Sequence, residues 1–290
     1  MKLPSVRTFA PENWSEVDYF STFCGGTHDF DSVTKRALSG VRNHYDKAQL
    51  LISVARKLAP NVSLDRTQLN TQGYTAGQNA REFSAVIEEV FTELYSVVDC
   101  TRKVIVATRK RCQGMPTGST RKLFAWVTRS DTPGSFPPEI ANAIRNANWY
   151  TELLYLRDEL THLDVGSCSV IGDGDKISYS HHGVSKAGKP LVINDILGHA
   201  HQLAAEIQSF VSAVFAYFNS ELAPSEVDQL CGFFLGRAYM RRLPSQRPVT
   251  FDSGTCAANG WFDTTPGYRC PFADSCGAYR RVGKGLATQP

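Results

Sequence analysis

The chain has 290 residues, enough to bury a sizeable hydrophobic core. Its hydrophobic share of 42% and charged share of 20% are typical of globular proteins, and the formal net charge of +3 neither favours nor excludes nucleic acid as a partner. The first residues lack the apolar stretch of a secretory signal, and the most apolar run, residues 210–218, is too short to span a bilayer. We therefore expect a cytoplasmic protein with no membrane association, in which most cysteines are reduced thiols.

The N-terminal third predicts two long helices after an irregular arm. Residues 1–30 contain prolines and glycines without a periodic apolar face, so we expect an arm or loop there. Residues 31–58 and 82–109 carry apolar side chains at helical spacing, and the second of these helices has the wider apolar face, which is typical of a central helix. Pro60 is expected to end the first helix, and the polar residues 61–78 are expected to connect the two.

The middle of the chain predicts a long loop, another helix and a hairpin. Residues 113–138 are rich in glycine and proline and are predicted to be a loop, with a short strand over residues 122–127. A helix is predicted over residues 138–164, because prolines are favoured in a first helical turn. Residues 170–179 have the pattern of a β-hairpin with a Gly-Asp turn.

The C-terminal part predicts two more helices, over residues 193–218 and about 227–243, before the composition changes to proline, glycine, cysteine and aromatics. The predicted fold is therefore all-α: a bundle of about five helices with a small β-hairpin insertion and an irregular, cysteine-containing C-terminal tail. The predicted domains are an N-terminal arm (residues 1–30), the helical bundle (residues 31–243) and the tail (residues 244–290).

The helix predicted to end at residue 164 combines a packing surface with a polar set. Five apolar residues recur at spacings of three and four and predict one buried stripe: Trp149, Leu153, Leu156, Leu160 and Leu163. Arg157, Asp158 and His162 lie between them. Arginine offers a cationic fork that matches phosphate oxygens, and histidine can transfer a proton near neutral pH. Together they are the minimum set for cleaving RNA without a metal, and Asp158, four residues before His162, can hold one imidazole nitrogen.

The spacing of Arg157 and His162 sets a geometric condition. Five positions correspond to about 140° around an ideal helix, so the two side chains do not converge. Either the helix loosens near Thr161, or a symmetric dimer brings two copies of the pair to one cleft. The purely structural alternative is that Arg157 and Asp158 form a solvated helix flank and that the helix dipole stabilises His162 as a C-terminal cation.

The pattern Arg157-Asp158-x3-His162 resembles the signature of HEPN domains. These are α-helical bundles, often ribonucleases of toxin–antitoxin and defence systems, that dimerise to form the active site. The resemblance implies a homodimeric endoribonuclease without metal or cofactor, in which Arg157 contacts phosphate, Asp158 orients and His162 is the general acid–base. It also implies RNA as substrate and, for a toxin, an antitoxin or other partner protein. The alternative is a catalytically silent HEPN-like module that binds a protein or a nucleotide.

Basic residues are concentrated between residues 101 and 130, where the sequence has eight Lys or Arg and no Asp or Glu. Because Lys and Arg make phosphate contacts, we predict this set to bind RNA: Arg109, Lys110, Arg111, Arg121 and Lys122. Phe124 and Trp126 are candidates to stack on bases. The alternative is an ordinary solvated face with core aromatics.

Four cysteines form a weak metal-site candidate: Cys231, Cys256, Cys270 and Cys276. Four thiolates can hold zinc tetrahedrally, but the spacing lacks the Cys-x2-Cys pairs of zinc knuckles. A structural zinc, a disulfide and free thiols are the alternatives, and no metal is assigned.

Overall fold

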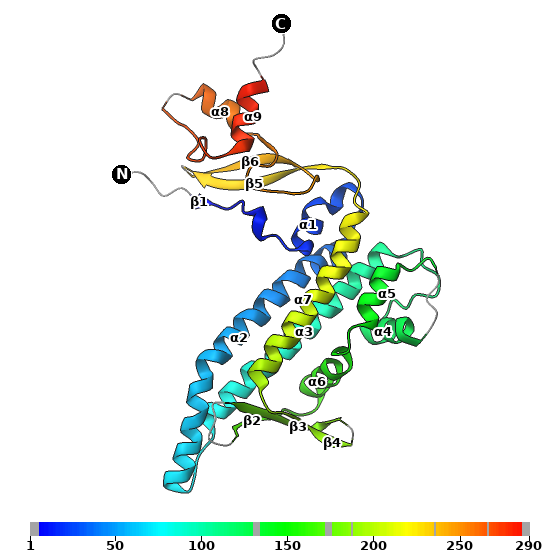
Figure 1. Cartoon of the computed structure of the whole chain (residues 1–290), viewed down its shortest axis with the longest axis vertical. Coiled ribbons are helices and arrows are strands. Elements are labelled where there is room, and N and C mark those ends of the chain that lie inside the picture. The colour runs from blue at the N-terminus through cyan, green and yellow to red at the C-terminus, as the bar shows by residue number, and fades with distance from the viewer. Residues whose placement is uncertain are drawn as a thin grey trace. The chain divides into compact units, whose positions relative to one another are not determined.

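The computed structural model describes residues 6–129, 134–171, 176–186, 188–234, 236–265 and 267–285. Within these residues it contains nine α-helices and two antiparallel sheets (Figure 1). The prediction of an all-α bundle of about five helices is therefore wrong. The chain divides into two compact units. We call Phe30–Tyr217 the helical unit, and Met1–Asp29 together with Phe218–Pro290 the sheet unit.

The helical unit is built on three long helices: α2 (Ser32–Gln72), α3 (Gln78–Thr108) and most of α7 (Ile196–Ser220). They run side by side in Figure 1, and the Tyr45 hydroxyl on α2 donates a hydrogen bond to the Gln208 side chain on α7 (2.9 Å). The apolar face of α3 is buried over most of its length, as its wide hydrophobic stripe predicts.

The α2 helix continues through Pro60 to Gln72 and is capped by Gly73, whose φ of 71° is a conformation that glycine favours. The prediction that Pro60 ends the helix and that residues 61–78 are a connector is therefore wrong. A proline removes one backbone hydrogen bond, but tertiary contacts compensate here. The buried Asp65 carboxylate accepts a hydrogen bond from the Ala80 backbone N–H (2.8 Å) and so attaches the end of α2 to the start of α3.

Three shorter helices complete the helical part of this unit: α4 (Thr120–Arg129), α5 (Pro138–Arg145) and α6 (Tyr150–His162). Helix α4 lies within residues 113–138, for which the sequence predicts a loop with a short strand over residues 122–127. Both predictions are wrong for the residues of α4. Its buried residues recur at helical spacing, and the Ser119 hydroxyl accepts a hydrogen bond from the Lys122 backbone N–H (3.2 Å) at its start. The glycines and prolines on both sides concealed this short helix.

A three-stranded antiparallel sheet belongs to the same unit, in the order β2 (Ser167–Val170), β3 (Ile177–Lys186), β4 (Lys189–Ile193). The β2–β3 pairing confirms the predicted hairpin, with Val170 opposite Ile177. The predicted turn, at residues 172–175, lies outside the described residues.

The sheet unit has a four-stranded antiparallel sheet in the order β1 (Val6–Arg7), β5 (Glu226–Phe234), β6 (Arg237–Pro244), β7 (Thr255–Cys256). Its helices are α1 (Glu16–Phe23), α8 (Asn259–Thr264) and α9 (Gly277–Gly285), with 3-10 turns η1 (Pro11–Asn13) and η2 (Cys24–Gly26). Ser15 and Asp18 form a reciprocal capping box at the start of α1.

The helix predicted over residues 227–243 is instead the β5–β6 hairpin. Tyr239, Arg241 and Leu243 are buried at a period of two, which is the period of a strand. The chain turns at Gly236, where φ is 71°. None of the helices in the described ranges is both long and apolar enough to cross a membrane.

Candidate nucleic-acid interface

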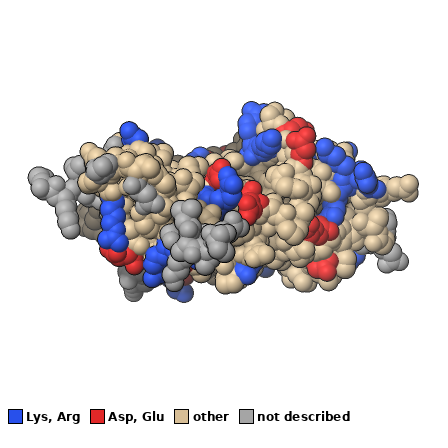
Figure 2. All heavy atoms as spheres, turned by 90° about the horizontal axis from the view of Figure 1, so that it is seen from above, with Lys and Arg blue, Asp and Glu red and all other residues tan. Residues whose placement is uncertain are grey.

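Helices α4, α5 and α6 enclose an open groove of about 470 Å³, which we call the arginine groove. Three arginines line it: Arg121, Arg129 and Arg145. Among the described residues that line the groove there is no Asp or Glu. On the face drawn in Figure 2, Lys and Arg lie beside Asp and Glu. The groove is therefore a local concentration of positive charge on a nearly neutral protein.

Tyr155 on α6 is the accessible aromatic side chain of the groove, with 51% of its surface exposed. Phe124 also lines the groove but is buried, and its ring stacks on Tyr150 at 3.9 Å between centroids. Trp126 packs edge-to-face against Phe136 (5.3 Å). Phe124 and Trp126 thus make core contacts, and Tyr155 is better placed to stack on a base.

Arg121 connects the groove to the predicted catalytic arginine through Asp158. The Asp158 carboxylate accepts hydrogen bonds from Arg121 Nη2 (2.7 Å) and from Arg157 Nη1 (2.8 Å). The Arg157 guanidinium also lies 4.5 Å from the ring centre of Tyr95 on α3. Arg121 is 57% exposed, so its ion pair with Asp158 is weak.

His162 is the last residue of α6 and is exposed. Within the described part of the chain its side chain has no hydrogen bond or ion pair, and Asp158 is engaged by the two arginines. The helix stays regular to His162, so loosening near Thr161 does not bring His162 towards Arg157. Within a single copy of the chain, the side chains of Arg157 and Asp158 are therefore in contact, and the side chain of His162 is not.

The segment after α6 is fixed by a half-buried carboxylate. Glu88 on α3 accepts hydrogen bonds from the Gly166 backbone N–H (2.6 Å) and the Tyr179 hydroxyl (3.0 Å). Burial raises the pKa of Glu88, against the opposing effect of these hydrogen bonds. A Cβ atom at position 166 would lie 2.3 Å from the Tyr179 ring, so only glycine fits. These contacts hold the chain just beyond His162.

The other residues predicted to bind RNA lie outside the groove lining. Lys122 is exposed on α4, while Lys110 and Arg111 are exposed in the turn after α3. The Arg109 guanidinium lies 4.9 Å from the ring centre of Tyr217. Of the basic residues predicted to bind RNA, only Arg121 lines the groove. Arg129 also lines it; this residue lies in the basic segment but is not among the predicted RNA-binding residues.

The start of α4 is attached to α3 through Asp99. The Asp99 carboxylate accepts hydrogen bonds from the Thr120 hydroxyl (2.7 Å) and from Arg102 (3.0 Å), and Arg102 also donates to the Thr117 carbonyl (2.9 Å). Burial alone would raise the pKa of Asp99, but hydrogen bonds from Lys103, Thr120 and Arg102 outweigh burial and lower the pKa to about 2.

Asp99→Asn is expected to destabilise the protein at neutral pH by roughly 1–3 kcal/mol, because the folded carboxyl has a lower pKa than the unfolded one. A depressed pKa contributes stability above the unfolded value of about 4, and this contribution disappears as the pH falls from about 4 towards 2. Urea unfolding of both proteins across that range checks this. Asp46→Asn, which removes an exposed pair with Arg42, should change stability by less than about 0.5 kcal/mol; an equal loss would contradict the role of Asp99.

The four cysteines of the metal-site candidate line one pocket of the sheet unit. None of the chain's eight cysteines, all within the described ranges, forms a disulfide. With side chains as they stand in those ranges, no three His, Cys, Asp or Glu residues are placed to share a metal ion.

The sequence did not reveal Arg145 and Tyr155 as groove residues, because the groove exists only once three helices pack together. It also did not reveal the ion pair between His199 Nε2 and Glu152 (3.3 Å), which lies beside a second hollow of about 770 Å³. His199 lies on α7 and Glu152 on α6, and no sequence pattern indicates that these two helices bring the two side chains together.

No protein-family model, no curated protein and no solved structure matches the chain. The likeness to HEPN domains therefore depends on the residues at 157, 158 and 162 alone.

Proposed function

We propose that this protein binds single-stranded RNA in the arginine groove. The observation that carries the proposal is the convergence of Arg121, Arg129 and Arg145 with the exposed Tyr155 in a groove whose described lining has no acidic residue. Arginines contact the phosphates, and a tyrosine ring stacks on an unpaired base. A single strand is favoured over a duplex because its bases are free to stack on a side chain.

The groove predicts a modest, salt-dependent affinity. Each phosphate contact to a single strand contributes about −0.7 to the slope of log K against log salt concentration, so three contacts give about −2. Fluorescence anisotropy with a labelled, unstructured RNA at several salt concentrations measures this slope. Arg129→Ala is expected to weaken binding and to reduce the slope by about 0.7.

Arg81→Ala is the matched control, since Arg81 is exposed on α3 and outside the groove lining. It should leave both affinity and slope unchanged. If Arg129→Ala and Arg145→Ala bind RNA as the wild type does, the groove is not the binding site.

Cleavage of the bound RNA is the second candidate function. The Asp158 carboxylate links Arg121 in the groove to Arg157, so one shared carboxylate connects the groove to the predicted catalytic arginine. Arg157 would contact the scissile phosphate and His162 of a second copy would act as general acid–base, with no metal or cofactor. Cleavage by this route requires a homodimer. It also requires the Asp158 carboxylate to release one of its two arginines before it can orient His162.

We also propose a cytoplasmic site of action. Eight cysteines without a disulfide among the described residues support a reducing compartment. If the protein cleaves RNA, we propose a role as a toxin or defence effector. Its partner would then be an antitoxin or another protein.

A further inference from the structure

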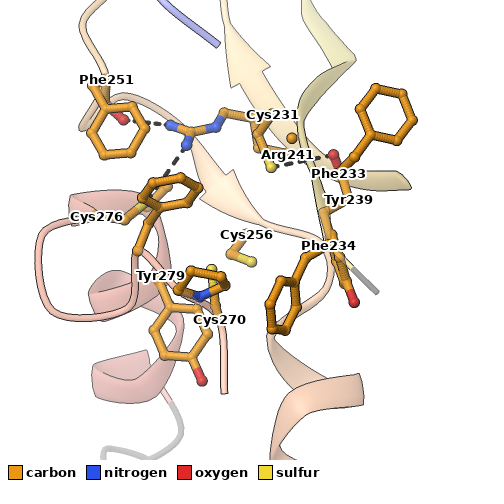
Figure 3. A pocket seen from close by; sticks show the side chains of 14 residues that line it. Cys231, Phe233, Phe234, Tyr239, Arg241, Phe251, Cys256, Cys270, Cys276 and Tyr279 are labelled. Carbon is orange, nitrogen blue, oxygen red and sulfur yellow. Dashed lines mark hydrogen bonds between the residues drawn. The ribbon is translucent and has the colours of Figure 1, made fainter. Parts of the chain in front are cut away.

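Four cysteines from separate segments of the sheet unit line one small pocket (Figure 3). They are Cys231 on β5, Cys256 on β7, Cys270 before Pro271, and Cys276 directly before α9. The pocket has a volume of about 30 Å³, and most of its other lining is aromatic. It has room for one ion or water molecule and not for an organic ligand.

A buried arginine lies among these thiols. Arg241 is 2% exposed, and its Nη2 donates a hydrogen bond to Cys276 Sγ (3.5 Å), as Figure 3 shows. Among the described residues no carboxylate pairs with Arg241, so the buried cation lacks a conventional counter-ion. Sulfur ligands of a metal would supply the negative charge.

All four cysteines border the same pocket, and Cys231 lies at an irregularity of the backbone. The register of the β5–β6 pairing shifts between Leu230 and Gly232, which places Cys231 at an irregularity that re-aims its side chain. A cysteine side chain reorients by rotation about a single bond, between staggered positions. Such rotations are needed, because the sulfur atoms as they stand do not surround one point at bonding distance.

We propose that Cys231, Cys256, Cys270 and Cys276 bind one Zn²⁺ ion in a tetrahedral tetrathiolate site. Four thiols match the coordination number of structural zinc, and most of the other lining of the pocket is aromatic. Four S–H protons leave to solvent as four Zn–S bonds form, which gives a centre of charge −2. The N–H groups of Arg241 offset part of this charge by donating to the sulfur atoms.

The ion would stabilise a part of the chain that has little regular structure. Strand β7 has two residues and α8 has six. Because such short elements bury little apolar surface, a cross-link between β5, β7 and the start of α9 provides stability that packing alone does not.

The test is a titration of the full chain with Co²⁺, after reduction, treatment with a chelator and removal of both reagents without oxygen. One equivalent is expected to produce the visible bands of tetrahedral Co²⁺ and a near-ultraviolet thiolate-to-cobalt band, and one equivalent of Zn²⁺ should bleach them. Only the weak spectrum of octahedral Co²⁺ would overturn the proposal.

Two pairs of variants locate the site. Cys256→Ser and Cys270→Ser, each tested as a single variant, should lose part of the charge-transfer intensity, because three thiolates remain. Each should also bind Co²⁺ at least about tenfold more weakly, since loss of even a residue that only supports a metal ligand costs about that much. Cys24→Ser in the sheet unit and Cys168→Ser in the helical unit lie outside the pocket and should keep the wild-type spectrum. Full intensity in the pocket variants, or equal loss in the controls, would refute the site independently of RNA binding.

Discussion

Leu156→Ala is expected to destabilise the protein by about 2–5 kcal/mol. Leu156 on α6 is 0% exposed, so alanine leaves a cavity among side chains that cannot fully close around it. Because α6 forms one wall of the arginine groove, its packing also sets the position of Tyr155. Urea unfolding at 25 °C, followed by near-ultraviolet circular dichroism, measures the loss.

Leu163→Ala is the matched control from the same predicted leucine stripe. Leu163 follows the last residue of α6 and is 77% exposed, so its truncation should change the free energy of unfolding by less than about 0.5 kcal/mol. Equal destabilisation by both variants would show that the apolar stripe continues past the helix end and would contradict this arrangement.

His162→Ala is expected to slow RNA cleavage by about 10²–10⁴-fold, the usual contribution of a general acid–base. RNA affinity should change by less than about twofold, because His162 is outside the groove lining. Single-turnover cleavage of labelled RNA in EDTA, at saturating protein concentration, measures the rate, and anisotropy on the same RNA measures the affinity.

His182→Ala provides the control for this rate, since His182 is another exposed histidine, on β3. It should cleave at the wild-type rate. If the wild-type protein leaves RNA intact in EDTA, or if His162→Ala cleaves normally, the ribonuclease candidate is wrong, while RNA binding in the groove can still hold.

Long periodic helices could be predicted from the sequence. The predicted helices over residues 82–109 and 193–218 correspond to α3 and α7 to within a few residues, because many apolar positions specify one face. The errors fall where tertiary contacts override a local signal. Pro60 does not end α2, since Asp65 attaches the following turns to α3. The β5–β6 hairpin has apolar residues that also fit a helical spacing, and Gly232 and Gly236 are the local signs against a helix.

In the candidate site, too, local features could be predicted from the sequence and tertiary contacts could not. The sequence placed Arg157 and Asp158 together and offered His162, four positions on, as the partner of the carboxylate. In the structure the Asp158 carboxylate pairs with the adjacent Arg157 and with Arg121, which is 37 positions away on α4. A pairing of this kind depends on how α4 packs against α6, and no local pattern encodes it.

The most direct test of RNA binding in the arginine groove is ultraviolet cross-linking of bound, unstructured RNA, followed by mass spectrometry of the cross-linked peptides. The peptides containing Tyr155 and residues 121–129 are expected to carry the nucleotide, and the double variant Arg129→Ala, Arg145→Ala should lose these cross-links. Cross-links confined to peptides of the sheet unit, unchanged in the double variant, would contradict the proposal.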